Sequence, residues 1–410
     1  MRVAFFTDCY LDLTGGITSS INAQKAALEN NGHTVYIFST GFPRSKKELQ
    51  KLTAKNIFVV PSCKIFFRGL TPISRRPKIV EKWLLKNHPE LKDFDIFYTH
   101  YEAGCSIAGL RLARKLNIPS VQVMHGREDM GESNIIPYGF RTIVAILLNW
   151  FHSWYLLHPI KIHRDDYLAN TIAKANMWTL MVNHANYADL VLTPSDHFRQ
   201  KLIHYGIKKE IKVLPNGFPD NKFPKNPGIK TLKSNEILRI IWHSRVSAEK
   251  RIMPFLHALT QVHGKYHLDV YGGGGDYFRA KRFARHHHLD VTFHGNVKID
   301  ELYTAIAKSH LDILVSYNFD TFGMTMIEAE AFGVPVFFCD PDMQEIMPKG
   351  SYIMSVDKTP TKMAAALNDL LKHPKKIEQM SKIMLNNRKN ILISHRIKTL
   401  ESIFQSITTK

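Results

Sequence analysis

Cysteine is scarce in this chain, and the few cysteines are far apart. The 410 residues include four, at positions 9, 63, 105 and 339, and none forms a Cys-x-x-Cys pair. We therefore expect free thiols in a reducing compartment and no disulfide framework. No secretory signal is expected either, because the first apolar stretch ends at Asp8 and is too short for one. The expected location is the cytoplasm.

Long uncharged runs are equally rare. Residues 143–160 carry no Asp, Glu, Lys or Arg, but polar side chains and Pro159 interrupt them. A membrane-spanning helix needs about 20 mostly apolar residues, with aromatic residues toward its two ends. Trp150 and Trp154 lie mid-segment, which argues against a spanning helix. Two interpretations remain: a buried core helix, or a helix that lies in a membrane interface or lines an apolar acceptor groove.

Acidic residues are outnumbered, since 36 Asp and Glu face 55 Lys and Arg and give a formal net charge of +19. This balance favours an anionic partner. Between residues 44 and 92, 13 basic residues stand against three acidic ones, with apolar residues interleaved. That mixture favours an anionic membrane surface, and a solvated helix face is the other interpretation. Candidate contacts are Lys46, Lys47, Arg75 and Arg76. No nucleic-acid-binding module is recognisable, so no nucleic-acid partner is expected.

Length, composition and periodicity predict two α/β domains. Hydrophobic residues make up 44% of a chain that is longer than one usual domain, which is enough for two cores. Short apolar strands alternate with helical segments in two series, as in doubly wound parallel-sheet (Rossmann-like) domains. The expected strands are 3–7, 34–39, 57–60, 96–99, 120–124 and 190–193, then 238–243, 267–271, 291–293, 313–316 and 335–339. The clearest expected helices are 19–30 and 107–116, and one basic helical stretch is expected over 374–406.

The expected division of the chain follows from these two series. We predict an N-terminal domain over residues 1–213 and a C-terminal domain over 214–385. Residues 386–410 are expected to form a C-terminal helix that packs back on the N-terminal domain. The joint between the domains falls within 214–235, where Pro, Asn, Gly and Lys dominate.

Glycines follow two of the expected strands. Gly15 and Gly16 lie between the first strand and the first helix, where glycine lets the backbone turn tightly and bring amides toward an anion. Four glycines at 272–275 indicate close backbone approach or a mobile loop. They lack the spacing of the dinucleotide fingerprint, so a dehydrogenase is not favoured.

Fixed cations follow the strand at 238–243. Arg245, Glu249 and Lys250 stand just beyond it. Arginine as a planar fork and lysine as a point charge can together hold a diphosphate, and a surface ion pair is the alternative. By contrast, the run of three histidines at 286–288 has no partner ligands nearby in sequence and is typical of a solvated helix end.

The most informative segment is 320–336, which reads Asp-Thr-Phe-Gly-Met-Thr-Met-Ile-Glu-Ala-Glu-Ala-Phe-Gly-Val-Pro-Val. A strand ends near Ser316, a loop containing Gly323 follows, and the next helix carries Glu328. Loop amides at a helix start can bind phosphate. A carboxylate one or two turns into that helix can reach ribose hydroxyls.

These motifs together resemble the GT-B-fold retaining glycosyltransferases of family 4. Residues 320–336 are similar to the family signature, and Arg245 with Glu249-Lys250 matches its Arg, spacer, Glu-Lys element. His125 stands at a strand end where the family carries its active-site histidine. Pro215-Asn216-Gly217 with Phe223 is similar to the family's interdomain element, and Gly15-Gly16 to its N-terminal glycine loop. The resemblance spans roughly residues 1–350.

The resemblance implies a nucleoside-diphospho-sugar donor and transfer of a hexose with retention of anomeric configuration. Arg245 and Lys250 would neutralise the leaving diphosphate, and Glu328 would hold the ribose. Asp320 would contact the donor sugar, and His125 would contact it near the reacting centre. The implied catalytic residues are thus His125, Asp320, Arg245 and Lys250, and the implied donor-binding residues are Gly16, Arg245, Lys250, Phe322, Gly323, Met324, Thr325 and Glu328.

The chemistry agrees with these roles. A glycosyl transition state resembles an oxocarbenium ion, and a diphosphate leaves more easily when its growing charge is neutralised. No metal or other cofactor is then required, with at most a non-essential stimulation by Mg²⁺. One position departs from the family, which usually has Glu where this chain has Asp320. The shorter side chain suits another donor sugar or displaces the contact, and Asn318 is a neighbour that can share it.

The acceptor is implied by position. In the GT-B architecture the N-terminal domain binds the acceptor, and both the basic region and residues 143–160 lie there. This arrangement is similar to the membrane-associated members of the family that glycosylate diacylglycerol. We therefore expect a peripheral glycolipid synthase at the inner face of the cell membrane, with UDP-glucose as donor and with Trp150, Trp154 and the four cations as acceptor or membrane contacts.

The alternatives are a polysaccharide, teichoic acid or glycoprotein acceptor, a soluble acceptor as in sugar–phosphate synthesis, or a catalytically degenerate partner subunit.

Overall fold

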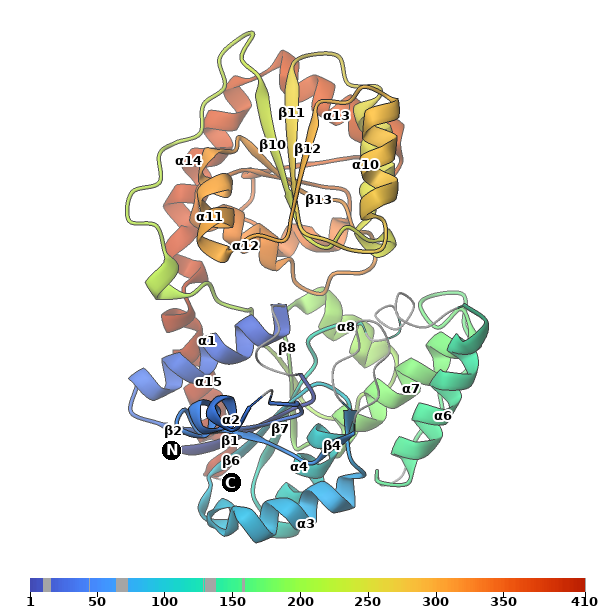
Figure 1. The fold of residues 1–410 in the computed structure, drawn as a ribbon, viewed down its shortest axis with the longest axis vertical. Helices are drawn as coiled ribbons and strands as arrows, with labels where there is room; N and C mark the ends of the chain where they lie inside the picture. Colours follow the sequence, from blue (N-terminus) through green and yellow to red (C-terminus); the bar gives the residue numbers. More distant parts are fainter. Residues whose placement is uncertain are drawn as a thin grey trace. The chain divides into compact units, whose positions relative to one another are not determined.

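The chain forms two compact α/β units. The computed structural model describes residues 1–9, 16–43, 45–63, 73–127, 129, 138–156 and 159–409 (Figure 1). Unit 1 comprises residues 1–215 and 396–410, and unit 2 comprises residues 216–395. The first crossing between the units thus lies two residues beyond the boundary expected at 213. Most of the last helix belongs to unit 1.

Unit 1 is built on a seven-stranded parallel sheet with the order β3-β2-β1-β6-β7-β8-β9. The strands are β1 (Arg2–Thr7), β2 (Thr34–Ser39), β3 (Ile57–Val59), β6 (Ile96–His100), β7 (Ser120–Val123), β8 (Leu190–Thr193) and β9 (Ile211–Val213). A short antiparallel pair, β4 (Ser62–Cys63) and β5 (Ile73–Ser74), stands apart from it. The helices are α1 (Gly16–Asn30), α2 (Lys46–Thr53), α3 (Pro77–Asn87), α4 (Gly104–Leu116), α6 (Arg141–Ser153), α7 (Ile172–Tyr187), α8 (Asp196–His204) and α15 (Ile393–Thr408).

Unit 2 repeats this plan with six parallel strands in the order β12-β11-β10-β13-β14-β15. They are β10 (Leu238–His243), β11 (Tyr266–Tyr271), β12 (Val291–Gly295), β13 (Leu311–Leu314), β14 (Val336–Phe338) and β15 (Tyr352–Met354). The helices are α9 (Ile252–Leu259), α10 (Tyr277–His286), α11 (Ile299–Lys308), α12 (Met324–Ala331), α13 (Pro360–Lys372) and α14 (Lys375–Asn387).

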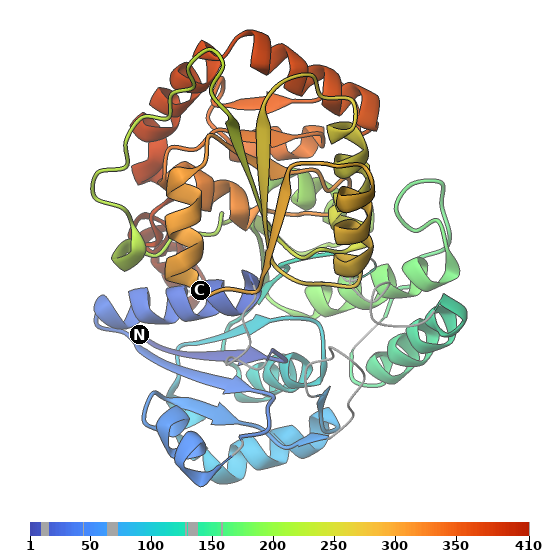
Figure 2. The same ribbon diagram turned by 45° about the horizontal axis from the view of Figure 1, so that its top comes forward.

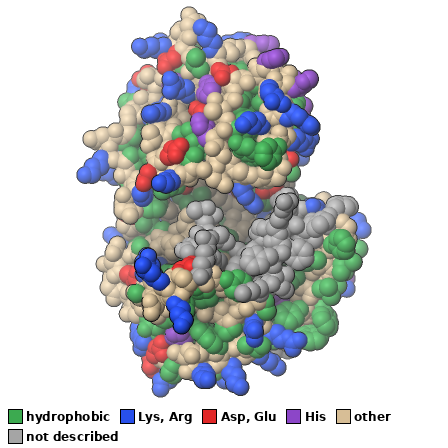
Figure 3. All heavy atoms as spheres, viewed as in Figure 1, with side chains coloured by type: hydrophobic (Ala, Val, Ile, Leu, Met, Phe, Trp, Pro, Cys, Tyr) green, Lys and Arg blue, Asp and Glu red, His purple; other side chains and the backbone are tan. Residues whose placement is uncertain are grey.

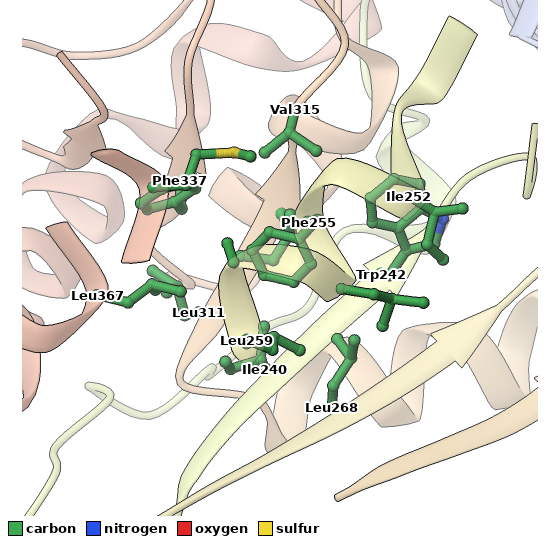
Figure 4. Packing of buried hydrophobic residues seen from close by; sticks show 14 of the residues in the cluster. Ile240, Trp242, Ile252, Phe255, Leu259, Leu268, Leu311, Val315, Phe337 and Leu367 are labelled. Atoms are coloured by element: carbon green, nitrogen blue, oxygen red, sulfur yellow. The ribbon is translucent and has the colours of Figure 1, made fainter. Parts of the chain in front are cut away.

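Both faces of the unit 2 sheet are covered, which explains why its central strands β10, β13 and β14 are mostly apolar. Alternate side chains of β10, such as Ile240 and Trp242, pack against α9, α10 and α13. Figure 4 shows this core, with Phe255 of α9 next to Trp242 and Phe337. Ile241 points to the other face, where α11, α12 and α14 contribute the core.

Unit 1 is covered in the same way. Phe6 and Phe38 pack with α3 and α4 on one face of the sheet. On the other face the ring of Tyr98 of β6 makes edge contacts with two aromatic rings. Its centroid lies 4.9 Å from that of Phe5 and 5.2 Å from that of Phe404 of α15. His33 and Glu401, 2.9 Å apart, join the turn before β2 to the same helix. The terminal helix is therefore part of the unit 1 fold.

The predicted fold class is confirmed, and several of its elements coincide with the expected ranges. β2, β8 and β10 begin and end at the expected residues. Four strands, β4, β5, β9 and β15, were not expected; each has only two or three residues, too few for a periodic pattern to be recognised.

The helical stretch expected over 374–406 is present but divided into two helices, because the chain leaves the helix between α14 and α15. There Phe218 pairs with Leu392, and the Phe218 amide donates to the Ile391 carbonyl at 2.7 Å. Gly217 is required at this approach, since a Cβ would lie 2.6 Å from the Ile393 Cα.

Candidate functional site

Chemistry-bearing residues gather at the carboxyl end of β10 and β13, the two central strands of unit 2. The chain leaves this pair in opposite directions, to β11 on one side and to β14 on the other. Ligands of doubly wound sheets bind at such a switch point, beyond the carboxyl ends of the strands. The loop after β10 carries Arg245 and Lys250, and the loop after β13 leads through Asp320 into α12.

Lys250 and Asp320 lie together at this edge. The Lys250 Nζ is 2.6 Å from the Asp320 Oδ1, and each side chain is 13% exposed. The other carboxylate oxygen of Asp320 accepts the Ser316 hydroxyl, and the ring of Phe319 lies 5.2 Å from the ammonium. Asp320 is thus anchored from two sides, and the pair still faces solvent enough to meet a ligand.

Arg245 pairs with a different carboxylate from that of Lys250. Its guanidinium pairs with Glu249, 3.2 Å away, and its side chain is 57% exposed while that of Glu249 is 2% exposed. Ser247 donates its hydroxyl to the same carboxylate. The Arg245 guanidinium is therefore held by a buried carboxylate, while more than half of the side chain is open to solvent. The loop brings Arg245 and Lys250 to one edge of the sheet without pairing them.

The N-terminus of α12 has the features of an anion site. Gly323 is its N-cap, and a Cβ there would lie 2.7 Å from the Met326 Sδ and 2.8 Å from a Leu314 methyl. Met324 and Thr325 open the helix, so their amides are among those without an intrahelical acceptor. The Thr325 hydroxyl oxygen is buried and has no hydrogen-bond partner within the described residues. Phe322, half-buried, precedes this turn.

Glu328 lies next to a buried histidine, His243. The His243 Nδ1 lies 3.3 Å from the Glu328 Oε2, and its Nε2 lies 3.0 Å from the Asp312 Oδ2. Only the contact with Asp312 has good hydrogen-bond alignment. Burial alone would lower the pKa of His243, but the charge and hydrogen bond of Asp312, together with Glu328, raise it to about 10. His243 is a cation between two carboxylates.

The four-glycine loop supports the loop that carries Arg245. A Cβ at Gly272 would lie 2.4 Å from the Ser244 carbonyl oxygen, and one at Gly274 would lie 2.4 Å from the Val246 carbonyl oxygen. Both glycines also have positive φ, at 116° and 156°. The Val246 amide donates to the Gly273 carbonyl at 2.9 Å. These glycines serve close approach of two backbones.

In unit 1, His125 follows β7 and pairs with His100, the last residue of β6. The His100 Nδ1 is 2.8 Å from the His125 Nε2, and the rings stack with an interplanar angle of 18°. Burial lowers the pKa of His125 to about 4, and burial with the nearby His125 lowers that of His100 well below its usual value. Both rings are neutral near pH 7, so one ring nitrogen donates and the other accepts.

Asp8 and Gly16 stand near the same edge of the unit 1 sheet. Asp8 follows β1 and accepts the amides of Cys105 and Ser106 at 2.8 and 3.1 Å, which caps α4. Burial raises the pKa of Asp8. Gly16 is the first residue of α1, and Gly15 lies outside the described residues.

Comparison with known proteins decides what this arrangement belongs to. The model for Glycosyltransferase Family 4 matches residues 14–222, just over half of the chain, and the model for Glycosyl transferases group 1 matches residues 229–386. The chain belongs to glycosyltransferase family 4.

Two similar proteins carry the same activity name. An alpha-monoglucosyldiacylglycerol synthase of Streptococcus pneumoniae (strain ATCC BAA-255 / R6) is 26% identical over 359 residues, which cover 82% of this chain and 70% of that protein. One of Acholeplasma laidlawii is 23% identical over 356 residues, which cover 82% of this chain and 79% of that protein.

Solved structures show the same GT-B fold. HepE of Anabaena in complex with UDP is 16% identical with a TM-score of 0.70, over 99% of this chain and 100% of that one. A sucrose-phosphate synthase of Thermosynechococcus elongatus is 15% identical with a TM-score of 0.73, over 100% of this chain and 99% of that one.

In this glycosyltransferase, α6 carries an exposed apolar face. Its exposed members are spaced along one side, at Phe140 (63% exposed), Ile143, Leu147, Trp150 (53%) and Trp154 (63%). The two tryptophan rings touch edge to face at 4.3 Å. Figure 3 shows apolar side chains gathered over this helix, and Figure 2 shows α7 beside it.

The interpretation of residues 143–160 as a buried core helix is wrong. Within α6 only Ala145 and His152 are buried, because α7 covers one side of the helix and nothing described covers the other. Among the described residues, no helix combines the length and the hydropathy needed to cross a bilayer.

The basic candidates of unit 1 are exposed. Lys46 and Lys47 lie on α2, a helix with no buried residue, and Arg75 and Arg76 come just before α3. Residues 64–72 of the basic region lie outside the described residues. All four cysteines are free, as expected. In the described parts of the chain, no three His, Cys, Asp or Glu side chains form a metal-binding group.

Sequence reasoning missed His243, Asp312, His100 and Ser316. In the sequence, His243 is simply the last residue of an apolar strand. The available signal is a titratable residue in each of three apolar strands, His100, His243 and Asp312, since such groups are buried only when they are paired.

Proposed function

We propose that this glycosyltransferase moves a hexose, glucose first among the candidates, from a nucleoside-diphospho-sugar such as UDP-glucose to a membrane lipid such as diacylglycerol, with retention of anomeric configuration. The exposed apolar face of α6 is the observation that carries the lipid acceptor. The protein would act as a peripheral enzyme at the inner face of the cell membrane.

The donor part rests on the edge of β10 and β13. Lys250 and Arg245 supply positive charge, and the first amides of α12 with the unpartnered Thr325 hydroxyl supply donors for phosphate oxygens. Glu328, 18% exposed, would accept the ribose hydroxyls. As the bond from sugar to diphosphate breaks, negative charge grows on the leaving group, and Lys250 would stabilise it. Asp320 would contact the donor sugar, and His125 the sugar near the reacting centre.

The acceptor part rests on unit 1. Trp150 and Trp154 are half or more exposed, yet aromatic side chains of this size favour an apolar or interfacial environment. The exposed cations of the basic region would add attraction to anionic lipids. The two similar monoglucosyldiacylglycerol synthases support the same class of acceptor.

We also propose that no metal ion is required, because Lys250, Arg245 and the α12 amides can balance the diphosphate charge. Mg²⁺ would at most stimulate the reaction. Full activity in excess EDTA is the expected result, and complete loss that Mg²⁺ restores would contradict it.

The test is a transfer assay with a panel of UDP-, GDP- and ADP-sugars and anionic vesicles that contain diacylglycerol. Radiolabel in the lipid phase with a UDP-hexose would support both donor and acceptor. NMR of the product would show whether the new linkage keeps the α configuration of the donor.

Two other results would redirect the proposal. Donor turnover without lipid labelling would point to a polysaccharide, teichoic acid, glycoprotein or soluble acceptor. Absence of donor binding with every nucleotide would point to a degenerate partner subunit. Lys250→Ala is the matched inactive control, and Lys281→Ala on the exposed side of α10 is the matched active one.

A further inference from the structure

His243 connects three elements at the carboxyl end of β10 and β13, where we propose that the donor binds. It is the last residue of β10, its side chain is 1% exposed, and it lies between Asp312 of β13 and Glu328 of α12. The far carboxylate is itself fixed, because the Asp312 Oδ1 accepts the Ile313 amide at 2.7 Å. A chain of contacts therefore runs from the β13 backbone through Asp312 and His243 to Glu328.

The series of contacts through Asp312 and His243 restrains one side of the Glu328 carboxylate and leaves another side accessible. The Oε2 lies 3.3 Å from the His243 Nδ1, while 18% of the side chain remains exposed. An ionised carboxylate forms stronger hydrogen bonds with hydroxyl donors than a neutral amide does. The carboxylate also keeps one orientation, since His243 cannot move without losing Asp312.

We propose that His243 is a positioning residue for the donor: it orients the Glu328 carboxylate toward the ribose hydroxyls of the bound nucleotide. This proposal rests on the donor site proposed above, in which Glu328 is the ribose ligand. His243 itself touches no substrate. Loss of His243 is expected to weaken binding only of ligands whose ribose hydroxyls donate hydrogen bonds to Glu328.

A purely structural ion pair is the competing account. In that case loss of His243 would loosen β10, β13 and α12 together, and every nucleotide would bind less well by a similar factor. A positioning role predicts a selective loss. The two accounts therefore differ in the ratio of affinities for a ribonucleotide and its deoxyribose analogues.

The experiment measures binding of UDP, 2′-deoxy-UDP and 3′-deoxy-UDP by calorimetry at pH 7. Hydrogen bonds to a charged group contribute about 1.5–3 kcal/mol, so the wild-type protein should bind UDP at least about tenfold more tightly than the analogue that lacks the recognised hydroxyl. Glu328→Gln and His243→Gln should each reduce this preference to about threefold or less, while binding of that analogue changes by less than about threefold.

The control is His310→Gln, which removes another buried histidine of unit 2. His310 precedes β13, at the amino end of the sheet, and accepts the Arg239 amide at 3.1 Å. It should leave the preference for UDP unchanged. Circular dichroism and thermal melting would establish that each variant is folded.

A second measurement needs no variant. In wild-type protein labelled with ¹⁵N-histidine at pH 8.5, a ring with protons on both nitrogens should shift on addition of UDP, and less on addition of the analogue. An unchanged preference in folded His243→Gln, or no cationic ring that responds to UDP, would overturn the role of His243 alone. Absence of UDP binding to the wild type would overturn the proposed donor and this role with it.

Discussion

At the scale of single residues, the proposed donor site at the carboxyl end of β10 and β13 depends on a few charged groups whose partners are already in place. Lys250 is 2.6 Å from Asp320, and Arg245 is 3.2 Å from Glu249. A diphosphate would therefore enter a site where each cation has a carboxylate neighbour. Lys250, at 13% exposure, is the better shielded cation, so its charge is less weakened by solvent than that of Arg245.

Lys250→Ala should lower turnover by about 10²–10³-fold, since a preorganised charge on a developing anion is worth that much in enzymes. The fold should persist, because the Asp320 carboxylate keeps its bond to Ser316. Steady-state kinetics with saturating donor and a thermal melt would measure both effects. Turnover within about threefold of the wild type would remove Lys250 from the proposed mechanism.

Asp320→Glu should change donor choice without unfolding unit 2. The longer side chain moves the carboxylate by about one methylene and disturbs its contacts with Ser316 and Lys250. We expect a different ratio of kcat/KM among the UDP-hexoses and a melting temperature close to that of the wild type. A variant that fails to fold would show that Asp320 has a structural role, and Asp320→Asn would then separate its charge from its size.

At the scale of elements, α6 and the basic segments of unit 1 differ from ordinary surface structure. The helix exposes a continuous apolar face, which a monomeric soluble surface seldom does without a partner. The basic residues of α2 and of the segment before α3 are solvated. Membrane association would bury the apolar face of α6 and would draw the basic residues to anionic lipids.

Replacing Trp150 and Trp154 with Ser should reduce vesicle binding by at least about tenfold, because burial of a large apolar side chain contributes about 1.5–3 kcal/mol. Stability should change little, since both rings are mostly exposed. Co-sedimentation with vesicles gives the measurement. Phe278→Ser, at 82% exposure on α10, is the control. Equal binding by both variants would exclude the α6 face from the membrane.

Reversing the charges of Lys46, Lys47, Arg75 and Arg76 should release the protein from anionic vesicles, as each surface cation contributes about 1 kcal/mol. Binding to neutral vesicles should be unaffected. Reversal of Lys281 and Arg282, exposed on α10, controls for net charge. Unchanged co-sedimentation of the unit 1 variant would mean that the basic region is only a solvated face.

At the scale of the whole molecule, the two units differ in how their buried histidines titrate. Unit 1 holds two neutral pairs, His100 with His125 and His152 with His184, the latter pair 3.3 Å apart between α6 and α7. Burial lowers the pKa of His152 to about 4 and that of His184 well below its usual value. Unit 2 holds His243, whose neighbouring carboxylates raise its pKa to about 10, and also His310, whose pKa is lowered by burial.

These shifts give the units opposite pH dependence. Histidine pKa values that are lower in the folded state make unit 1 less stable as pH falls from about 6.5 toward 4, with an opposing effect from Asp8. A raised pKa makes the His243 contribution complete below about 6.5 and progressively lost toward 10. Hydrogen exchange at pH 5.0, 6.5 and 8.5 should show unit 1 weakened at 5.0 and unit 2 at 8.5. The same trend in both units would contradict these assignments.

The amino-acid sequence by itself determined the elements and their order. Apolar strands such as 238–243 and 190–193 are visible locally, because a strand buried on both faces is apolar at most positions. The Asp320–Val336 motif is also local, since a loop, a helix start and a carboxylate follow one another along the chain. The fold class and the family could therefore be predicted.

Only the tertiary structure decided which distant groups meet and which faces stay open. Asp312 lies 69 residues beyond His243, and they touch because β10 and β13 are neighbours, which strand order and not local pattern fixes. Likewise, the apolar spacing along α6 is the same whether the helix is buried or exposed. What differs is whether another element covers it, and α7 covers one side only. Local periodicity encodes amphipathicity, while long-range packing assigns each face its neighbour.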